Sequence, residues 1–577
     1  GRESFKQVLN KDRLRDSIRR INLDEDGNEW LDDSKIDRAI LQLERAPRGR
    51  LMEANKRATE MLLHGVETEG FDGERAVVIH FIDWNNAENN DFLAIDQFRV
   101  DPLGSSGDSG YIIPDIVLFV NGIPVVVVEC KSPTSSDPMS SGINQLQRYA
   151  NQRHWHDENE GCERLFHYNQ FVISTFRYKA KSGTFCANED NFIEWKDPWP
   201  LTIDELAQEL SKEPKDITSQ EILIAGMMTK QNIIDIMRHF VLVDGSSSRE
   251  VKIVGRYHQF RAVHNAMYRL KNGLTREKHG EVDRRGGIIW HTQGSGKSMT
   301  MTFLLRAMRD DLILRRFKIV IVTDRVDLQQ QLAETAQLSG EHLTVCRSIS
   351  DLRANIRREG PGLIFAMIQQ YQEQDNEDLH EVLNDSPEIV VFIDEAHRTQ
   401  AGLLHANLMR AMPNCAKIGF TGTPIIVSEA KKTWEIFGSY LDKYTIKESE
   451  NDGATLPIIY EGFADNSTIS DSDELDTKFH DMFSDRTPEE WKIIQQKHAT
   501  KRHVLESEKL IEMKAHHMMK HYVQGILPNG FKAQVVCVSR LAAVRYQSAL
   551  MRAKDQLIER IDSLDQGLLG LNELELE

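Results

Sequence analysis

The segment GIIWHTQGSGKSMTMTFLLRAM (287–308) combines residue types that could bind the phosphates of a nucleotide. An apolar run leads into a glycine-rich loop, and a helical sequence follows. In such a loop, glycines let backbone N–H groups turn toward the phosphates, a lysine neutralises the terminal phosphates and a hydroxyl ligates Mg²⁺. His291 replaces the first glycine of the usual pattern. The residues that we expect to bind the nucleotide are Thr292, Gln293, Gly294, Ser295, Gly296, Lys297 and Ser298.

A second string, IVVFIDEAH (389–397), would complete an ATP-hydrolysing site. Asp394 lies where the apolar run ends, and Glu395 follows it. Asp394 could hold Mg²⁺ through water together with Ser298, and Glu395 could orient or deprotonate the attacking water. A strand that ends in two solvated carboxylates is common by itself. Its position downstream of the glycine-rich loop favours the ATPase interpretation.

A third set of residues could cleave a phosphodiester bond. Pro114-Asp115 stands at one apolar run, and Glu129 and Lys131 end the next one. In a strand, residues two apart share a face, so Glu129 and Lys131 should point the same way. Asp115 and Glu129 could then hold Mg²⁺ against a scissile phosphate, while the lysine stabilises the attacking hydroxide or the charge of the transition state.

This acid–lysine pattern is weak alone, because a solvated carboxylate and lysine at a strand edge would also produce it. Two features strengthen it. The run PVVVVECK (124–131) reads as a buried strand, where charged side chains are costly unless they are paired or bound to metal. Gln145 and Tyr149, in the helical string QLQRY, lie one turn apart on one face.

The nuclease candidates require strands in the first part of the chain. The first 70 or so residues read as helical, and strand texture follows over 76–131, with Asn121-Gly122 as a hairpin turn. We expect a helix over 142–153, then short strands and loops over 166–199. Polar stretches at 211–219 and 245–250 indicate domain boundaries.

From residue 251 the texture predicts a parallel sheet that helices cover on both faces, because continuous apolar strands alternate with helical segments. We expect an acidic loop at 464–474 and a further buried strand at 533–540. The predicted fold class is a multidomain α/β protein. Its expected parts are a nuclease domain (1–215), a connection (216–250), an ATPase lobe (251–435) and the start of a second lobe (436–577).

Composition is compatible with several such domains. A chain of 577 residues is too long for one hydrophobic core. Its content of 40% hydrophobic and 28% charged residues is ordinary for a globular protein. The chain lacks the run of about 20 apolar residues that a membrane span needs. A polar start and scattered cysteines predict a cytoplasmic protein with reduced thiols. The net charge of −18 argues against a uniformly basic surface but allows a local basic track for nucleic acid.

The two ATPase strings resemble superfamily 2 helicases, and further strings match in order. Gln259 in GRYHQFRAV stands where such proteins place a glutamine for adenine. Residues 319–332 resemble the motif whose loop tracks a DNA strand, and residues 366–372 resemble the next such motif. The resemblance implies that His397, Thr421 and Thr423 link the ATP site to DNA. QVVCVSR (534–540) is similar to the first motif of a second motor lobe, and the closing motifs of that lobe do not follow, so we expect the lobe to be truncated.

The whole arrangement is similar to the restriction subunit of type I restriction–modification enzymes. The strings PDIVLFVNGIPVVVVECKSP, INQLQRYA and DEAHRTQ match that family's texture in order. The resemblance implies a PD-(D/E)xK nuclease with Asp115, Glu129 and Lys131 as its triad, Gln145 and Tyr149 in support, and RecA-like motor lobes. Asp91 is expected to be structural. Family members are longer, so we expect an N-terminal fragment.

The function that this resemblance implies is ATP-dependent DNA translocation followed by Mg²⁺-dependent cleavage of unmodified duplex DNA. ATP and Mg²⁺ are the implied cofactors, and modification (methyltransferase) and specificity subunits are the implied partners. Two alternatives stay open. One is a repair-type helicase–nuclease acting at DNA ends, in which we would expect the nuclease to follow the motor. The other is a non-cleaving, ATP-gated DNA clamp.

Overall fold

The computed structural model describes residues 4–45, 49–68, 76–102, 110–153, 160–245, 250–280, 283–323, 343–367, 382–394, 410–423, 437–457 and 506–563. The chain divides into two compact units, Gly1–Ile458 and Ile459–Glu577, and each is described by itself. None of the helices in the described ranges is long and apolar enough to cross a membrane.

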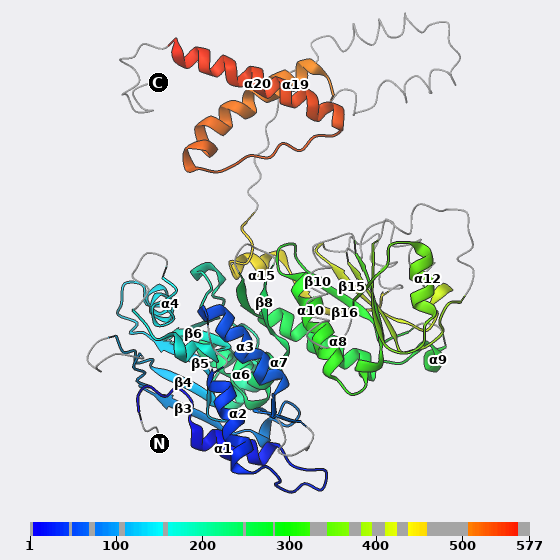
Figure 1. Cartoon of the computed structure of the whole chain (residues 1–577). Coiled ribbons are helices and arrows are strands. Elements are labelled where there is room, and N and C mark those ends of the chain that lie inside the picture. The colour runs from blue at the N-terminus through cyan, green and yellow to red at the C-terminus, as the bar shows by residue number, and fades with distance from the viewer. Residues whose placement is uncertain are drawn as a thin grey trace, which may run out of the picture. The chain divides into compact units, whose positions relative to one another are not determined.

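Three helices open the first unit, as the sequence predicted: α1 (Lys11–Ile21), α2 (Asp33–Arg45) and α3 (Leu51–His64). Each buries one apolar stripe, such as Leu14 and Ile18 of α1, which is the pattern of helices that pack on a sheet. Figure 1 shows them in blue beside the first large sheet. A small antiparallel pair, β1 (Val66–Thr68) and β2 (Val77–Ile79), follows.

Within the described residues, five strands form the first large sheet, in the order β3-β4-β5-β6-β7. Their bounds are Phe92–Asp96, Ile116–Val120, Ile123–Cys130, Phe171–Phe176 and Lys179–Gly183. Only the β5–β6 pair among them is parallel. The predicted hairpin turn is confirmed, because Asn121 and Gly122 join β4 to β5 with positive φ angles of 51° and 78°.

Helix α4 (Pro138–Tyr149) joins β5 to β6 and packs on both strands. It begins four residues before the predicted 142 and ends four before 153. Asp137 caps its first turn by accepting from the Ser140 N–H, and Pro138 stands at the first helical position, where its missing N–H costs nothing. These capping residues explain why α4 begins earlier than predicted.

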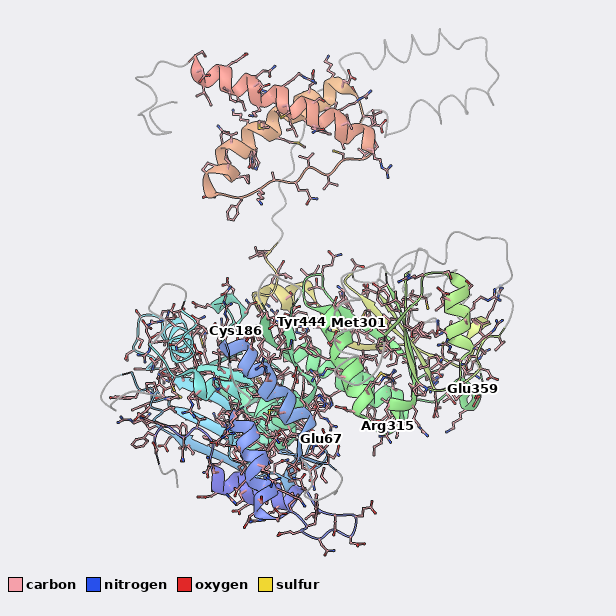
Figure 2. All side chains as sticks on the ribbon, in the orientation of Figure 1. Glu67, Cys186, Met301, Arg315, Glu359 and Tyr444 are labelled. Carbon is pink, nitrogen blue, oxygen red and sulfur yellow. The ribbon has the colours of Figure 1, made fainter. Side chains whose placement is uncertain are left out.

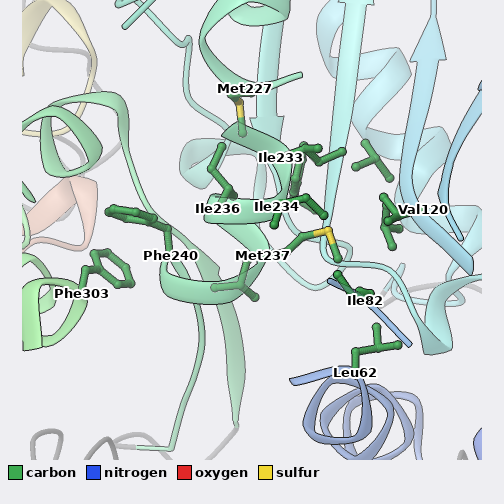
Figure 3. Packing of buried hydrophobic residues seen from close by; sticks show 14 of the residues in the cluster. Leu62, Ile82, Val120, Met227, Ile233, Ile234, Ile236, Met237, Phe240 and Phe303 are labelled. Atoms are coloured by element: carbon green, nitrogen blue, oxygen red, sulfur yellow. The ribbon is translucent and has the colours of Figure 1, made fainter. Parts of the chain in front are cut away.

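The connection consists of α5 (Ile203–Leu210), α6 (Ser219–Met227), α7 (Lys230–His239) and a hairpin of β8 (Val241–Asp244) with β9 (Val251–Val254). The boundary expected at residue 250 is wrong, because β9 pairs with β8 across it. Figure 3 shows apolar side chains of α7 between Phe303, from the part of the chain with the second large sheet, and Val120, Ile82 and Leu62 of the first domain. The connection is therefore a packed part of one core.

The second large sheet has seven parallel strands among the described residues, ordered β12-β13-β11-β14-β15-β10-β16. In chain order, β10–β16 span Gly287–His291, Lys318–Thr323, Leu343–Val345, Gly362–Met367, Ile389–Asp394, Ala416–Thr421 and Tyr440–Tyr444. Its helices are α8 (Tyr257–Asn272), α9 (Arg276–His279), α10 (Lys297–Asp310), α12 (Ile349–Arg357) and α15 (Ile446–Asn451).

Alternate residues of this sheet enter two different hydrophobic clusters, such as Ile319 and Ile321 in one and Val320 and Val322 in the other. The prediction of a parallel sheet buried on both faces is confirmed. The lobe boundary expected at residue 435 is wrong, because β16 lies beside β10 and completes the first lobe. Figure 1 shows β10, β15 and β16 with α8 and α10 against them.

The described part of the second unit is a pair of helices, α19 (Glu508–His521) and α20 (Arg540–Asp562), that pack through Ile511, Ala515 and Tyr546. The buried strand predicted at 533–540 is wrong. Residues 531–538 have no strand structure, and Val536 is 86% exposed. A strand needs neighbours for its backbone N–H and C=O groups, and no strand of the described residues in this unit supplies them.

Shorter helical turns complete the described residues: η1 (Ala87–Asn89), η2 (Glu163–His167), η3 (Glu189–Asn191), η4 (Pro214–Asp216), η5 (Leu314–Arg316), η7 (Tyr522–Ile526) and η8 (Leu527–Asn529).

Candidate nuclease and nucleotide sites

Asp115 stands directly before β4 and is held by neighbours on both sides. Its Oδ2 accepts the backbone N–H of Cys130 at 2.7 Å, and its Oδ1 accepts from Gln97 Nε2 at 3.1 Å. Gln97 lies at the end of β3 with a positive φ of 48°. Nothing in the sequence pattern singled out Gln97, because its contact depends on the β3–β4 register.

Glu129 is buried near the end of β5, with 1% of its surface exposed. Its Oε1 accepts from Lys131 Nζ at 2.6 Å, and its Oε2 has no hydrogen-bond partner among the described residues. Burial raises the pKa of Glu129 to about 7, and the nearby Asp115 charge adds to this, while Lys131 opposes it. A buried carboxylate oxygen without a donor favours a bound cation.

Lys131 is held by a chain of hydrogen bonds through α4. Its Nζ donates to Gln145 Oε1 at 2.5 Å, Gln145 Nε2 donates to the Tyr149 hydroxyl, and that hydroxyl donates to the Ile113 carbonyl at 3.1 Å. Ile113 precedes Pro114-Asp115 in the chain. The structure thus brings together all five residues predicted for the nuclease site, and α4 ties the lysine to the strand that carries Asp115.

The two carboxylates fit a hard cation such as Mg²⁺, which takes oxygen ligands and keeps several waters. Asp115 and Glu129 would hold it, and the unpartnered Glu129 Oε2 is the free ligand atom. Among the described residues no group of three His, Cys, Asp or Glu side chains is placed to hold a metal, so water and substrate would complete the shell. Asp91 lies at the opposite end of the β3–β4 pair from Asp115, in a two-oxygen contact with Arg13 at 2.8 and 2.7 Å.

The phosphate loop connects β10 to α10. Gly294 and Gly296 have φ angles of 81° and 84°, a region that glycine adopts without strain. A Cβ on Gly296 would lie 2.6 Å from Gln259 Nε2. Helix α10 begins at Lys297, and no side chain caps its first turn. Its N-terminal N–H groups can therefore bind phosphate oxygens.

Gln259 contacts this loop, although both ends of its amide are engaged within the protein. Its Nε2 donates to the Gly296 carbonyl at 3.0 Å, and its Oε1 accepts the Arg256 N–H at 2.8 Å. Lys297 is buried, and its Nζ donates to the His291 carbonyl at 3.3 Å. A Cβ on Gly422 would lie 2.7 Å from Lys297 Nζ, so the loop after β15 abuts the phosphate loop.

The remaining ATP-site candidates lie at the carboxyl ends of the central strands. Asp394 is buried at the end of β14 and accepts from the Thr323 hydroxyl of β11 at 3.1 Å. The Thr421 hydroxyl donates to the Thr423 carbonyl at 3.2 Å. The loop and these strand ends fit the phosphates of a nucleoside triphosphate with Mg²⁺ at Ser298 and Asp394. Glu395 and His397 lie outside the described residues.

A buried polar network holds His291, the residue at the first position of the loop. Its Nε2 lies 2.9 Å from Asp442 Oδ2 on β16, and Asp442 Oδ1 accepts from Arg261 Nε at 2.5 Å. Arg261 also donates to Asp197 Oδ2 at 2.6 Å. Burial lowers the pKa of His291 despite the Asp442 contact. Tyr444, labelled in Figure 2, ends β16, and its ring stacks on His258 at 3.7 Å between centroids.

The first large sheet carries Asp115, Glu129 and Lys131, and the second carries the phosphate loop. This order defines a two-domain, nuclease-like and ATPase-like architecture, and the comparison with known proteins agrees with it. Residues 2–191 match the family "Type I restriction enzyme R protein N terminus", and residues 258–492 match the family "SWI2/SNF2 ATPase". The chain is therefore similar to type I restriction enzyme R subunits. The family resemblance stated from the sequence is confirmed.

Two curated relatives illustrate the match. The putative MjaIXP endonuclease subunit of Methanocaldococcus jannaschii is 28% identical over 563 residues, which cover 94% of this chain and 51% of the relative. The HindI endonuclease subunit of Haemophilus influenzae is 31% identical over 484 residues, which cover 80% of this chain and 43% of the relative. The chain thus spans about half the length of the relatives it matches.

A solved structure of a nuclease-deletion mutant of the Type ISP restriction-modification enzyme LlaGI with a DNA substrate mimic matches 53% of this chain and 33% of its own. The identity is 13% and the TM-score 0.24, which is too low to support an argument.

Proposed function

We propose that this chain forms the nuclease and first motor lobe of an ATP-dependent DNA translocase and Mg²⁺-dependent endonuclease, acting with modification and specificity subunits on unmodified duplex DNA. One observation carries the proposal. The hydrogen-bond chain from Glu129 through Lys131 and Gln145 to Tyr149 lies in the same compact unit as the phosphate loop. The two family matches support it, because both candidate sites stand in the order of the matched families.

At the nuclease site, the protein's part is to place charges around a phosphodiester. Bound Mg²⁺ would polarise the scissile phosphate and lower the pKa of a water. Asp115 and Glu129 would hold the ion. The Lys131 ammonium lies beside Glu129, one of the two carboxylates that would hold the ion. It would therefore stabilise the attacking hydroxide as the P–O bond breaks. Gln145 keeps Lys131 in this place, and Tyr149 fixes Gln145 relative to Asp115.

At the ATP site, the loop N–H groups and Lys297 would neutralise the phosphates, while Ser298 and Asp394 would hold Mg²⁺. We propose Glu395 for orienting the attacking water. Gln259 would act on the nucleotide through Gly296, whose carbonyl it binds. His397, Thr421 and Thr423 are proposed to pass the state of the ATP site to DNA, since the Thr421 loop abuts Lys297.

The test of the nuclease assignment separates the two activities. Glu129→Ala should reduce cleavage by the intact protein with its partner subunits at least about a hundredfold, because one of two metal-holding carboxylates is lost. DNA-stimulated ATP hydrolysis should be unchanged. Asp91→Ala, which removes an acid at the opposite end of the β3–β4 pair that is bound to Arg13, is the matched control and should keep cutting. Normal cleavage by Glu129→Ala would refute the assignment.

A further inference from the structure

The turn between β6 and β7 is the two-residue loop Arg177-Tyr178. Two-residue hairpins require positive φ and usually place Gly, Asn or Asp there. Here Arg177 has a φ of 45°. A long cationic side chain in a left-handed position is an outlier, and such outliers gather at functional sites.

This hairpin is a concentrated basic patch in an acidic protein. Arg177, Lys179 and Lys181 fall within five residues, and no Asp or Glu occurs between 164 and 188, whereas the chain's net charge is −18. Arg177 and Lys179 are exposed, and the Tyr178 ring is 47% exposed. None of the three cations forms an ion pair with another residue in the described ranges. The Arg177 guanidinium lies over the Tyr178 ring at 5.8 Å.

The patch continues the row of the candidate nuclease residues. Ser174 of β6 pairs with Glu129 on one side and with Lys181 on the other. Directly paired side chains share a face, as do residues two apart in a strand. Lys179 and Lys181 therefore extend from the Glu129 face. The two strand spacings between Glu129 and Lys181 amount to about 10 Å, or roughly three base-pair steps along DNA.

The hairpin is held from behind by α6. The Ser219 hydroxyl bonds to both the N–H and the carbonyl of Ala180, at 3.3 Å each. Gln220 donates through its N–H to the Tyr178 carbonyl and through Nε2 to the Thr175 hydroxyl at 2.8 Å. A preorganised basic surface loses less entropy when it binds.

Asp137, the N-cap residue of α4, interacts with this surface through Lys181 and offsets part of that one charge. Hydrogen bonds from Ser140 and the charge of Lys181 lower the pKa of Asp137. That carboxylate is already used as the cap of α4. The cations of the tip, Arg177 and Lys179, have no such neighbour among the described residues.

We propose that the β6–β7 hairpin binds the sugar–phosphate backbone of duplex DNA beside the scissile phosphate, with Arg177, Lys179 and Lys181 as phosphate contacts and Tyr178 against the sugars. This inference rests on the proposed nuclease function. The binding is independent of base sequence, because phosphate contacts position DNA without reading it. A site that cuts wherever translocation stops requires such binding.

The test uses the intact protein and a variant with Arg177→Asn, Lys179→Gln and Lys181→Gln. Asn is chosen because it tolerates the left-handed turn. With a short duplex and EDTA, affinity should fall about tenfold or more, and the slope of log K against log salt should drop by about 2 to 3. The matched control replaces Arg45, Arg50 and Arg57 by Gln, three exposed arginines of the α2–α3 region, and should bind as the parent does.

A second measurement decides the question if the triple variant folds poorly. A photoreactive benzophenone amino acid at Tyr178 should cross-link to DNA, whereas the same group at Leu41, an exposed position on α2, should not. Parent-like affinity and salt slope, or absence of the Tyr178 cross-link, would overturn the hairpin proposal. Cleavage by Glu129→Ala in the same preparation tests the nuclease assignment separately, because binding and cross-linking do not depend on it.

Discussion

Asp442 contacts the first residue of the phosphate loop although it lies far from it in sequence. One carboxylate oxygen contacts His291 and the other accepts from Arg261, and all three groups are largely withdrawn from water. His291 stands where a glycine would leave the loop unattached. His291 therefore ties the start of the loop to β16, where a glycine would leave it free to move.

Asp442→Asn should weaken this hold, because a neutral amide loses the charge-assisted bond to Arg261. We expect KM for ATP to rise about three- to tenfold with a smaller change in kcat, since mainly ground-state binding is lost. Steady-state ATP hydrolysis measures both. Glu388→Gln, just before the start of β14 and so at the end away from Asp394, should leave KM and kcat unchanged. An unchanged KM for Asp442→Asn would show that the loop needs no support from β16.

At the scale of elements, α4 must approach the sheet closely to bring Gln145 to Lys131. Gly142 permits this, because a Cβ there would lie 2.2 Å from the Ser174 hydroxyl oxygen and 3.5 Å from Lys131 Cγ. The same helix carries Tyr149 to the Ile113 carbonyl. Small size at Gly142 thus allows α4 to lie close to Ser174 of β6.

Gly142→Ala should destabilise the protein by about 1–3 kcal/mol through overpacking, despite the helix propensity of alanine. In a Ser174→Ala background the cost should largely vanish, since the nearest remaining Ser174 atom would be at 3.4 Å. Thermal unfolding of the four proteins of this double-mutant cycle measures the coupling. Equal costs in both backgrounds would mean that the α4 contact is not with Ser174.

Helices α7, α8 and α10 meet at a partly buried ionic cluster. His239 bridges Asp235 at 2.6 Å and Asp310 at 2.9 Å, His264 lies 2.7 Å from Asp235, and Arg238 lies 2.8 Å from Asp310. Burial alone would lower the pKa of His239, but the hydrogen bonds to Asp235 and Asp310 outweigh it and raise the pKa.

A raised pKa in the folded state means that His239 stabilises the fold fully below its unfolded pKa and loses this effect as pH rises through the folded value. The loss of Tm caused by His239→Gln should therefore be larger at about pH 6 than at about pH 9. His64→Gln, at the end of α3, serves as a control with little effect at either pH. A loss that does not depend on pH would contradict a charged His239.

At the scale of the whole first unit, α7 makes the nuclease-like and ATPase-like sheets parts of one hydrophobic core. The sequence allowed the fold class and the central strands to be predicted, because these depend on local patterns, while the roles of the candidate site residues stay predictions. Continuous apolar runs predicted β10, β11, β13, β14 and β15, and the Asn-Gly turn predicted the β4–β5 hairpin.

What the sequence could not show depends on long-range pairing. The β16 string YLDKY resembles no strand pattern until β10 lies beside it, and Asp442 acquires its role only in that register. Gln97 likewise reaches Asp115 only through the β3–β4 pairing. The apolar string at 533–538 failed as a strand for the converse reason, since no partner strand is described in its unit.

We propose that ATP use at the phosphate loop drives DNA cleavage at the Asp115–Glu129–Lys131 site. This proposal is tested most directly by measuring cleavage of circular duplex DNA by the intact protein with its partner subunits, comparing the parent with Lys297→Ala. The account predicts that Lys297→Ala, which lacks the phosphate-neutralising ammonium, neither hydrolyses ATP nor cuts, although its nuclease residues are unchanged. Parent-like cleavage by Lys297→Ala would contradict the account.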